Sequence, residues 1–144
     1  MIRNQIANAI VALLQSATLN SQPTFQSVSR KLLMWTNVPV QPAAFVTKYL
    51  ESSVGKSDTL PRIRSFNYRI FVFMQSGDDT SGNASSIDDL LDSVELVFTP
   101  SPVTGKLTLG GLVSHCRIDG QIVIDPGDLD GQALITIPVS VLLP

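Results

Sequence analysis

The hydrophobic positions near the start of the chain recur every three to four residues, with polar residues between them. They are Ile2, Ile6, Ile10, Leu13 and Leu14. Because side chains three and four positions apart share one face of a helix, this period predicts an amphipathic helix. We expect the helix to end near Asn20, before Pro23.

The segments that follow show the two-residue period of strands. Phe25–Lys31 and Ala43–Leu50 are predicted to be short strands, and Ile63–Gln75 is predicted to be a long one. One face of the long strand is apolar throughout, with Phe66, Tyr68, Ile70, Val72 and Met74. Phe71 and Phe73 make the other face apolar in its later half, so we expect this strand at the centre of a sheet.

A second helix is predicted after the polar segment Ser76–Ser85. Ser85 and Ser86 precede Asp88 and Asp89 with the spacing of a capping box, which places the carboxylates near the positive end of the helix dipole. The apolar stripe of this helix consists of Ile87, Leu90, Leu91, Val94 and Phe98.

The last third of the chain predicts two long strands joined by an acidic turn. Leu112–Asp125 alternates, and Asp125–Gly131 is dense in turn-forming residues. Ile135–Leu143 then repeats the two-residue period. Pro138 lies inside this final strand, and because proline has no N–H we expect an edge strand or a bulge there. The expected core face of the first strand carries Leu112, Cys116, Ile118, Ile122 and Ile124.

The order of these elements is helix, three strands, helix, two strands. It predicts an α+β fold for residues 1–144 as a single domain, with two helices packed on a mixed, mostly antiparallel sheet of about four to five strands. Hydrophobic residues make up 44% of the chain and charged residues 15%, as in a folded protein with buried interfaces. The net charge of -2 argues against nucleic-acid binding, and no apolar run is long enough to span a membrane.

The sequence holds one cysteine and one histidine, which excludes an internal disulfide and leaves little for a metal site. We therefore expect no cofactor, and folding in a reducing cytoplasm. Cys116 lies beside His115, a pair that could suggest a nucleophile and its base. Adjacent strand residues point to opposite faces, so we expect Cys116 in the core and no enzyme activity from this pair.

Two further motifs fail in detail. Gly55-Lys56-Ser57 resembles the end of a phosphate-binding loop, but Leu50 stands where the first glycine is required and no helix follows. The polar stretch Glu51–Pro61 is therefore predicted to be a solvated loop.

Three aspartates of the acidic turn, Asp125, Asp128 and Asp130, could suggest calcium. The calcium loop of an EF-hand needs glycine at its sixth position and glutamate at its twelfth. Counted from Asp125, these positions hold Asp130 and Thr136, so a polar turn is the better interpretation.

Charged residues are segregated along the chain. Arg62 and Arg64 share one strand face, and Arg117 and Asp119 share another. A run of carboxylates, without a Lys or Arg among them, consists of Asp78, Asp79, Asp88, Asp89, Asp92 and Glu95. Such charges are either simply solvated or complementary between neighbouring copies of the chain. On the second interpretation the subunit or tube interface comprises Arg62, Arg64, Asp88, Asp89, Asp92, Arg117 and Asp119.

An ordered set of segments carries a resemblance to a known family. After the first helix these segments are Phe25–Arg30 with Trp35, Pro42–Val46, Tyr68–Phe73, Ile87–Asp92, Leu109–Leu112, Ile118–Gly120 and Ile137–Val139. In this order, over nearly the whole length, the chain is similar to the tail terminator (minor tail protein) family of long-tailed bacteriophages.

The resemblance implies a structural protein of the virion, at the head-proximal end of the tail, that is assembled in the host cytoplasm. It implies a homo-hexameric ring that caps the tail tube, ends tube polymerisation and offers a face to the head-completion or connector protein. The tail tube protein would be a partner, and DNA would only pass through the lumen. The alternatives are another neck or tail-completion protein and, from a different class, a small-ligand or peptide-binding module; an enzyme ranks third.

Overall fold

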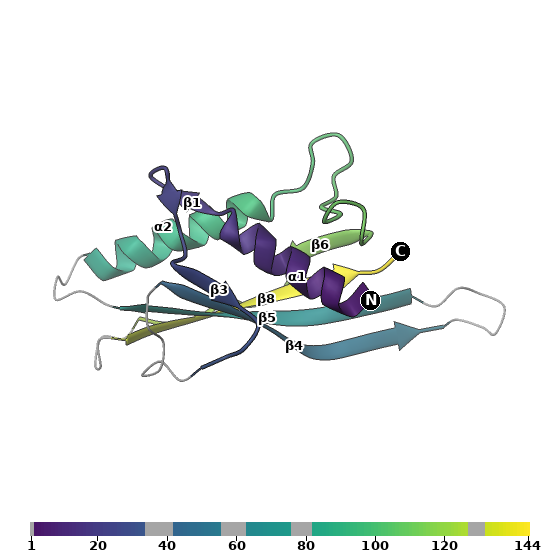
Figure 1. Ribbon diagram of the computed structural model, residues 1–144, viewed down its shortest axis with the longest axis horizontal. Coiled ribbons are helices and arrows are strands. Elements are labelled where there is room, and N and C mark those ends of the chain that lie inside the picture. Colours follow the sequence, from purple (N-terminus) through teal and green to yellow (C-terminus); the bar gives the residue numbers. More distant parts are fainter. Residues whose placement is uncertain (1, 34–41, 56–62, 76–81, 127–131) are drawn as a thin grey trace.

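The structure is a computed structural model, and it describes residues 2–33, 42–55, 63–75, 82–126 and 132–144. It confirms the predicted α+β class. In the described residues two helices, α1 (Ile2–Gln15) and α2 (Gly82–Val97), cover one face of a six-stranded sheet (Figure 1).

The sheet is mixed and mostly antiparallel, as predicted. Its strands, in spatial order, are β3 (Ser27–Ser29), β4 (Ala43–Val54), β5 (Ile63–Gln75), β8 (Gln132–Leu142) and β6 (His115–Ile118), with β7 (Val123–Asp125) also paired to β8. Only the pair β3 and β4 is parallel among these described strands. The aromatic strand β5 lies between β4 and β8, which confirms its predicted central place.

The main core lies between the helices and the sheet. The helices contribute side chains at helical spacing: Ile6, Ala7, Ile10 and Leu14 from α1, and Ile87, Leu90 and Val94 from α2. The alternate residues of β5 from Phe66 to Met74 fill the sheet side, as the two-residue period predicted. A smaller cluster of Ala43, Phe45 and Phe73 packs on the opposite face, with the Phe45 and Phe73 rings edge to face at 5.7 Å.

The helix α1 is shorter than predicted and ends at Gln15 rather than near Asn20. The residues that follow form a two-stranded ribbon of β1 (Thr18–Leu19) and β2 (Gln22–Pro23). Asn20 and Ser21 turn the ribbon with positive φ angles of 52° and 64°, as in the two-residue turns that suit hairpins. The tight turn therefore competes successfully with the last helical turn.

The ribbon is tied to α2 through a buried serine. Ser93 Oγ donates to the Thr18 carbonyl oxygen at 3.0 Å, and Thr24 Oγ1 lies 2.5 Å from the same Ser93 Oγ. Since the Ser93 proton is already used, Thr24 is the donor in the second bond. This chain of hydroxyls fixes the segment after α1 against the second helix.

The start of α2 also differs from the prediction. The helix begins at Gly82, so Asp88 and Asp89 lie in its second turn and no acidic residue lies in the first. The dipole effect falls off within the first turn, and the predicted capping role of these carboxylates is therefore wrong. The predicted apolar stripe of α2 is confirmed, because Ile87, Leu90 and Val94 are buried.

The strand β4 runs to Val54, four residues into the segment predicted as a loop. Its register shifts between Lys48 and Leu50, and it then continues to pair with β5 as far as Val54 opposite Ile63. These last residues are exposed, so backbone hydrogen bonds rather than an apolar face hold the ribbon. The rest of the predicted loop lies outside the described residues.

The predicted strand Leu112–Asp125 is broken into β6 and β7. β6 pairs Ile118 with Val139, and β7 pairs Val123 with Thr136, so the edge strand bulges opposite Pro138. The Pro138 carbonyl oxygen accepts from the Asp119 N–H at 3.1 Å, which shows that its nitrogen, without a proton, also faces this edge. The expected bulge at the proline is confirmed. Pro138 itself lies on the inner strand β8, which is paired on both sides, so the alternative of an edge strand at the proline is wrong.

Candidate interaction site

The acidic residues predicted at an interface lie on the outer side of α2. Asp88, Asp89, Asp92 and Glu95 are all exposed, and none forms an ion pair with another described residue. Leu96 beside them is 72% exposed. This helix therefore presents an acidic surface with an apolar side chain at its later end.

The other predicted interface residues do not join that surface. Arg117 and Asp119 form an exposed pair with each other, Nη2 to Oδ2 at 3.5 Å, and such surface pairs contribute little to stability. Arg64 lies at the start of β5, with its guanidinium carbon 5.4 Å from the centre of the Phe66 ring. Arg62 lies outside the described residues. The structure thus divides the predicted site among three places.

A basic cluster, consisting of Arg3, Arg30, Lys48 and Arg64, gathers at the α1 end of the sheet around Glu51. Arg3 makes two hydrogen bonds to the Glu51 carboxylate, from Nε at 2.7 Å and from Nη2 at 3.1 Å. Lys48 Nζ bonds to the same carboxylate. Arg30 donates instead to the Asn4 side-chain oxygen at 3.1 Å.

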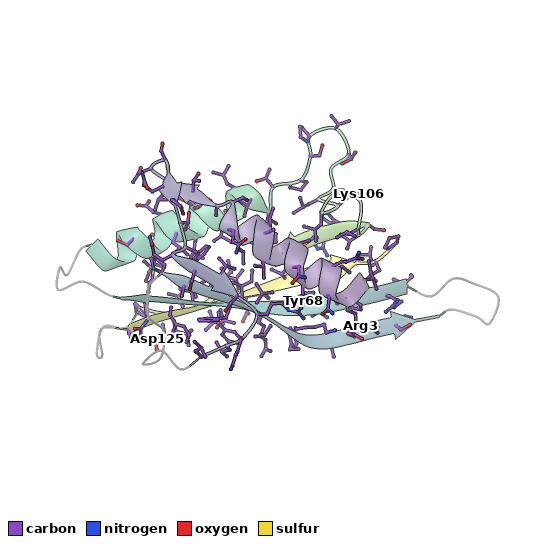
Figure 2. All side chains as sticks on the ribbon, viewed as in Figure 1. Arg3, Tyr68, Lys106 and Asp125 are labelled. Carbon is purple, nitrogen blue, oxygen red and sulfur yellow. The ribbon has the colours of Figure 1, made fainter. Side chains whose placement is uncertain are left out.

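An aromatic ring lies beneath these cations. The Phe66 ring is buried, and Lys48 Nζ and the Arg3 guanidinium carbon approach its centre to 5.0 Å and 5.6 Å. A cation above a ring face is attracted by the ring quadrupole. Phe66 therefore holds both cations in place through its ring face. Figure 2 shows Arg3 beside Tyr68 at this end of the sheet.

The electrostatics of the cluster perturb two groups. Hydrogen bonds from Arg3 and Lys48 lower the pKa of Glu51 to about 2, and the bonds that Arg3 donates to Glu51 raise the pKa of Arg3. Burial raises the pKa of the Tyr68 hydroxyl to about 12. At neutral pH the cluster thus holds an ionised glutamate and a protonated tyrosine.

The cluster encloses a cavity of about 350 Å³. Its lining residues are Arg3, Arg30, Val46, Thr47, Lys48 and Tyr68. Tyr68 is only 2% exposed, and its hydroxyl has no hydrogen-bond partner among the residues that the structure describes. A buried polar group without a partner costs about 1–3 kcal/mol, so this hydroxyl is an exception that requires an explanation.

Sequence reasoning missed this cluster. Its members come from α1, the segment after β3, β4 and β5, so no local motif joins them. The alternation of β5 placed Tyr68 in an apolar row, where it was counted as core. Its hydroxyl was the available signal, because a buried tyrosine usually needs a hydrogen-bond partner.

The two residues considered for catalysis, Cys116 and His115, have structural roles. Cys116 is fully buried, and burial raises the pKa of its thiol to about 12. The His115 ring accepts a hydrogen bond at Nδ1 from the Leu107 N–H at 3.1 Å. His115 therefore holds the 99–114 segment onto the sheet. Within the described part of the chain no cluster of His, Cys, Asp and Glu could hold a metal ion.

The sheet face opposite the helices carries exposed apolar side chains. Tyr49, Leu50, Val123 and Leu142 are all exposed, and the Arg69 guanidinium carbon lies 4.1 Å from the Tyr49 ring centre. Neither α1 nor α2 covers this face in Figure 1. No helix in the described residues has the length and apolar character that a membrane span requires.

These features define an α+β protein with an acidic helix surface, a basic cluster and one sheet face that neither helix covers. No model of a protein family matches the chain, and no curated protein matches it. A solved structure described as the virion of a native gene transfer agent (GTA) particle contains a chain of similar fold. The two are 14% identical, the match covers 98% of this chain and 90% of that one, and the TM-score is 0.45. A likeness this slight assigns no role to the protein.

Proposed function

We propose that the protein is a non-enzymatic assembly protein of a phage-like virion. In this proposal its copies form a ring that caps the tail tube, ends tube polymerisation and provides the interface to the head connector. The observation that carries the proposal is the separation of charge on the fold. The acidic surface lies along the middle and later part of α2, and the basic cluster lies apart from it, near the start of α1, where Figure 2 labels Arg3.

This arrangement favours a head-to-tail contact between copies. The acidic residues of α2 have no cationic partner among the described residues, while Arg30 in the basic cluster forms no ion pair there. Complementary charge across a contact sets orientation and excludes wrong partners. A head-to-tail contact repeated with a closing rotation generates a ring.

The tail-terminator role rests on the ordered resemblance of segments described above. In the structure these segments include β3, the start of β4, the middle of β5, the middle of α2 and part of the last strand. The buried, protonated Cys116 and the structural hydrogen bond of His115 support a protein without catalytic chemistry.

The first test is the mass of the purified protein in solution, alone and with tail-tube protein. A sixfold mass, or a ring that appears only with tube, is the expected result. A ring that ignores tube protein would indicate another neck or tail-completion component. A strict monomer that ignores tube protein would refute the proposal and favour a small-ligand or peptide-binding module.

Charge reversal tests the contact itself. We expect Asp88→Lys with Asp92→Lys to abolish association, and Arg30→Glu with Arg64→Glu to do the same. A one-to-one mixture of the two variants should recover the ring with the variants alternating, because the native ends match each other and the reversed ends match each other. Lys106→Glu is the matched control, since this exposed lysine lies on neither surface. Equal loss of association in the control would show a general charge effect and refute the assignment.

A further inference from the structure

Two independent observations meet in the cavity beneath α1. The first is the Tyr68 hydroxyl, which is buried, protonated and without a partner in the described residues. A hydroxyl in this condition is available to donate one hydrogen bond. The side chain stands on the central strand β5, whose neighbours on both sides fix its position.

The second observation is an imbalance of charge in the lining. Arg3, Arg30 and Lys48 all line the cavity, and Glu51 is the one carboxylate that pairs with any of them in the described residues. Arg30 interacts electrostatically with the Tyr68 hydroxyl and spends one of its donors on Asn4. A guanidinium has five N–H donors, so several remain for a ligand.

We propose that this cavity is a binding site for an oxyanion, held by Arg30, Lys48 and Arg3 and hydrogen-bonded by Tyr68. The chemistry fits because the cationic side chains supply charge and directed donors while the tyrosine supplies a neutral donor at the base. A cavity of about 350 Å³ admits a group as small as a phosphate or a carboxylate. The site shares Arg30 with the proposed contact between copies, but binding of a free anion does not rest on the proposed ring.

The oxyanion has two possible sources with the same chemistry, a free inorganic anion or a carboxylate side chain of a neighbouring copy. Inorganic phosphate and acetate are therefore titrated separately, at constant ionic strength, against wild type, Arg30→Gln and the control Lys106→Gln. The readouts are thermal unfolding, chemical shifts of the arginine Nε–H groups, and solution mass.

A free anion as ligand predicts saturable stabilisation of wild type by phosphate or acetate. Arg30→Gln should weaken the affinity about tenfold, because the variant loses hydrogen bonds from a charged group. A neighbour's carboxylate as ligand predicts a different result. The wild type would be oligomeric and indifferent to added anion, and Arg30→Gln, but not Lys106→Gln, would reduce its mass to that of the monomer.

Tyr68→Phe distinguishes a ligand site from a merely structural tyrosine. Without anion the variant should unfold at a temperature about 3–6 °C higher, because it no longer buries a hydroxyl without a partner. With saturating ligand this gain should shrink or change sign, since the wild type then uses the hydroxyl. If no anion binds and Arg30→Gln leaves the mass unchanged, or if both arginine and lysine variants respond equally, the proposal is overturned.

Discussion

Gly120→Ala tests whether the broken edge strand is held by a contact between Gly120 and Pro138. Gly120 has φ of +125°, a conformation that L side chains rarely adopt. A Cβ at this position would lie 3.1 Å from Pro138 Cγ and 3.4 Å from Pro138 Cβ. The proline ring is rigid and its strand is paired on both sides, so it cannot easily move away.

The expected cost has two parts. Backbone strain for a residue other than glycine at such an angle is about 1–3 kcal/mol, and overpacking against the ring adds about 1–3 kcal/mol. A loss of about 3 kcal/mol should lower Tm by about 9 °C in a domain of this size. The bulge that offsets β6 from β7 is the feature that this substitution strains.

Thermal and urea unfolding measure the effect, with Gly105→Ala as the matched control. Gly105 also has a positive φ, +68°, but no atom lies within 4 Å of its added Cβ. The control therefore retains only the backbone part of the cost, about 1 kcal/mol.

A double-mutant cycle separates the two parts at Gly120. Pro138→Ala removes Cγ, so combined with Gly120→Ala it should recover about 1–2 kcal/mol relative to the sum of the single variants. Equal losses for Gly120→Ala and Gly105→Ala, together with an additive cycle, would refute the contact between glycine and proline.

Three further outcomes are expected. The Cys116 thiol, with its pKa of about 12 and complete burial, should react with Ellman's reagent at mildly alkaline pH only at the rate of unfolding; rapid labelling of native protein would show that the core opens locally. The depressed pKa of Glu51, about 2, means that its contribution to stability is present above the unfolded value of about 4.3 and is lost as the pH falls towards 2. Glu51→Gln should therefore flatten the dependence of Tm on pH between about pH 5 and pH 2, and an unchanged profile would contradict the ion pairs. Ser93→Ala should cost about 1–3 kcal/mol in urea unfolding, because it leaves the buried Thr24 hydroxyl without its partner and removes a bond to the Thr18 carbonyl oxygen; a loss within error of zero would show that the hydroxyl chain is not important for stability.

The sequence predicted the elements whose burial follows a simple period. The apolar stripe of α2 and the alternation of β5 and β8 are confirmed because each packs one face against the core. The extension of β4 to Val54 could not be predicted in this way. Its last residues are exposed, and Glu51, Ser52 and Ser53 are polar on both faces, so the hydrophobic pattern carries no signal there.

The break between β6 and β7 escaped prediction for a different reason. Pro138 removes a backbone donor from β8, and the resulting bulge appears in the neighbouring edge strand, at Gly120. The two residues lie in different segments of the sequence. The oxyanion cavity is non-local in the same sense, since Arg3, Arg30 and Lys48 meet only after the sheet has formed. Periodicity within one segment contains no information about such cross-strand pairing.

The inner position of β8 has a consequence for the order of folding during synthesis. Gln75 pairs with Gln132 and Ser65 with Leu142. The second edge of β5 therefore stays unpaired until the residues of β8 have been synthesised. β6 and β7 are made earlier than β8 but have it as their sheet partner. Helix α2 and the β4–β5 hairpin can therefore form on the ribosome, while closure of the sheet is a late and slow event. Until then the apolar edge of β5 is exposed to aggregation or to a chaperone.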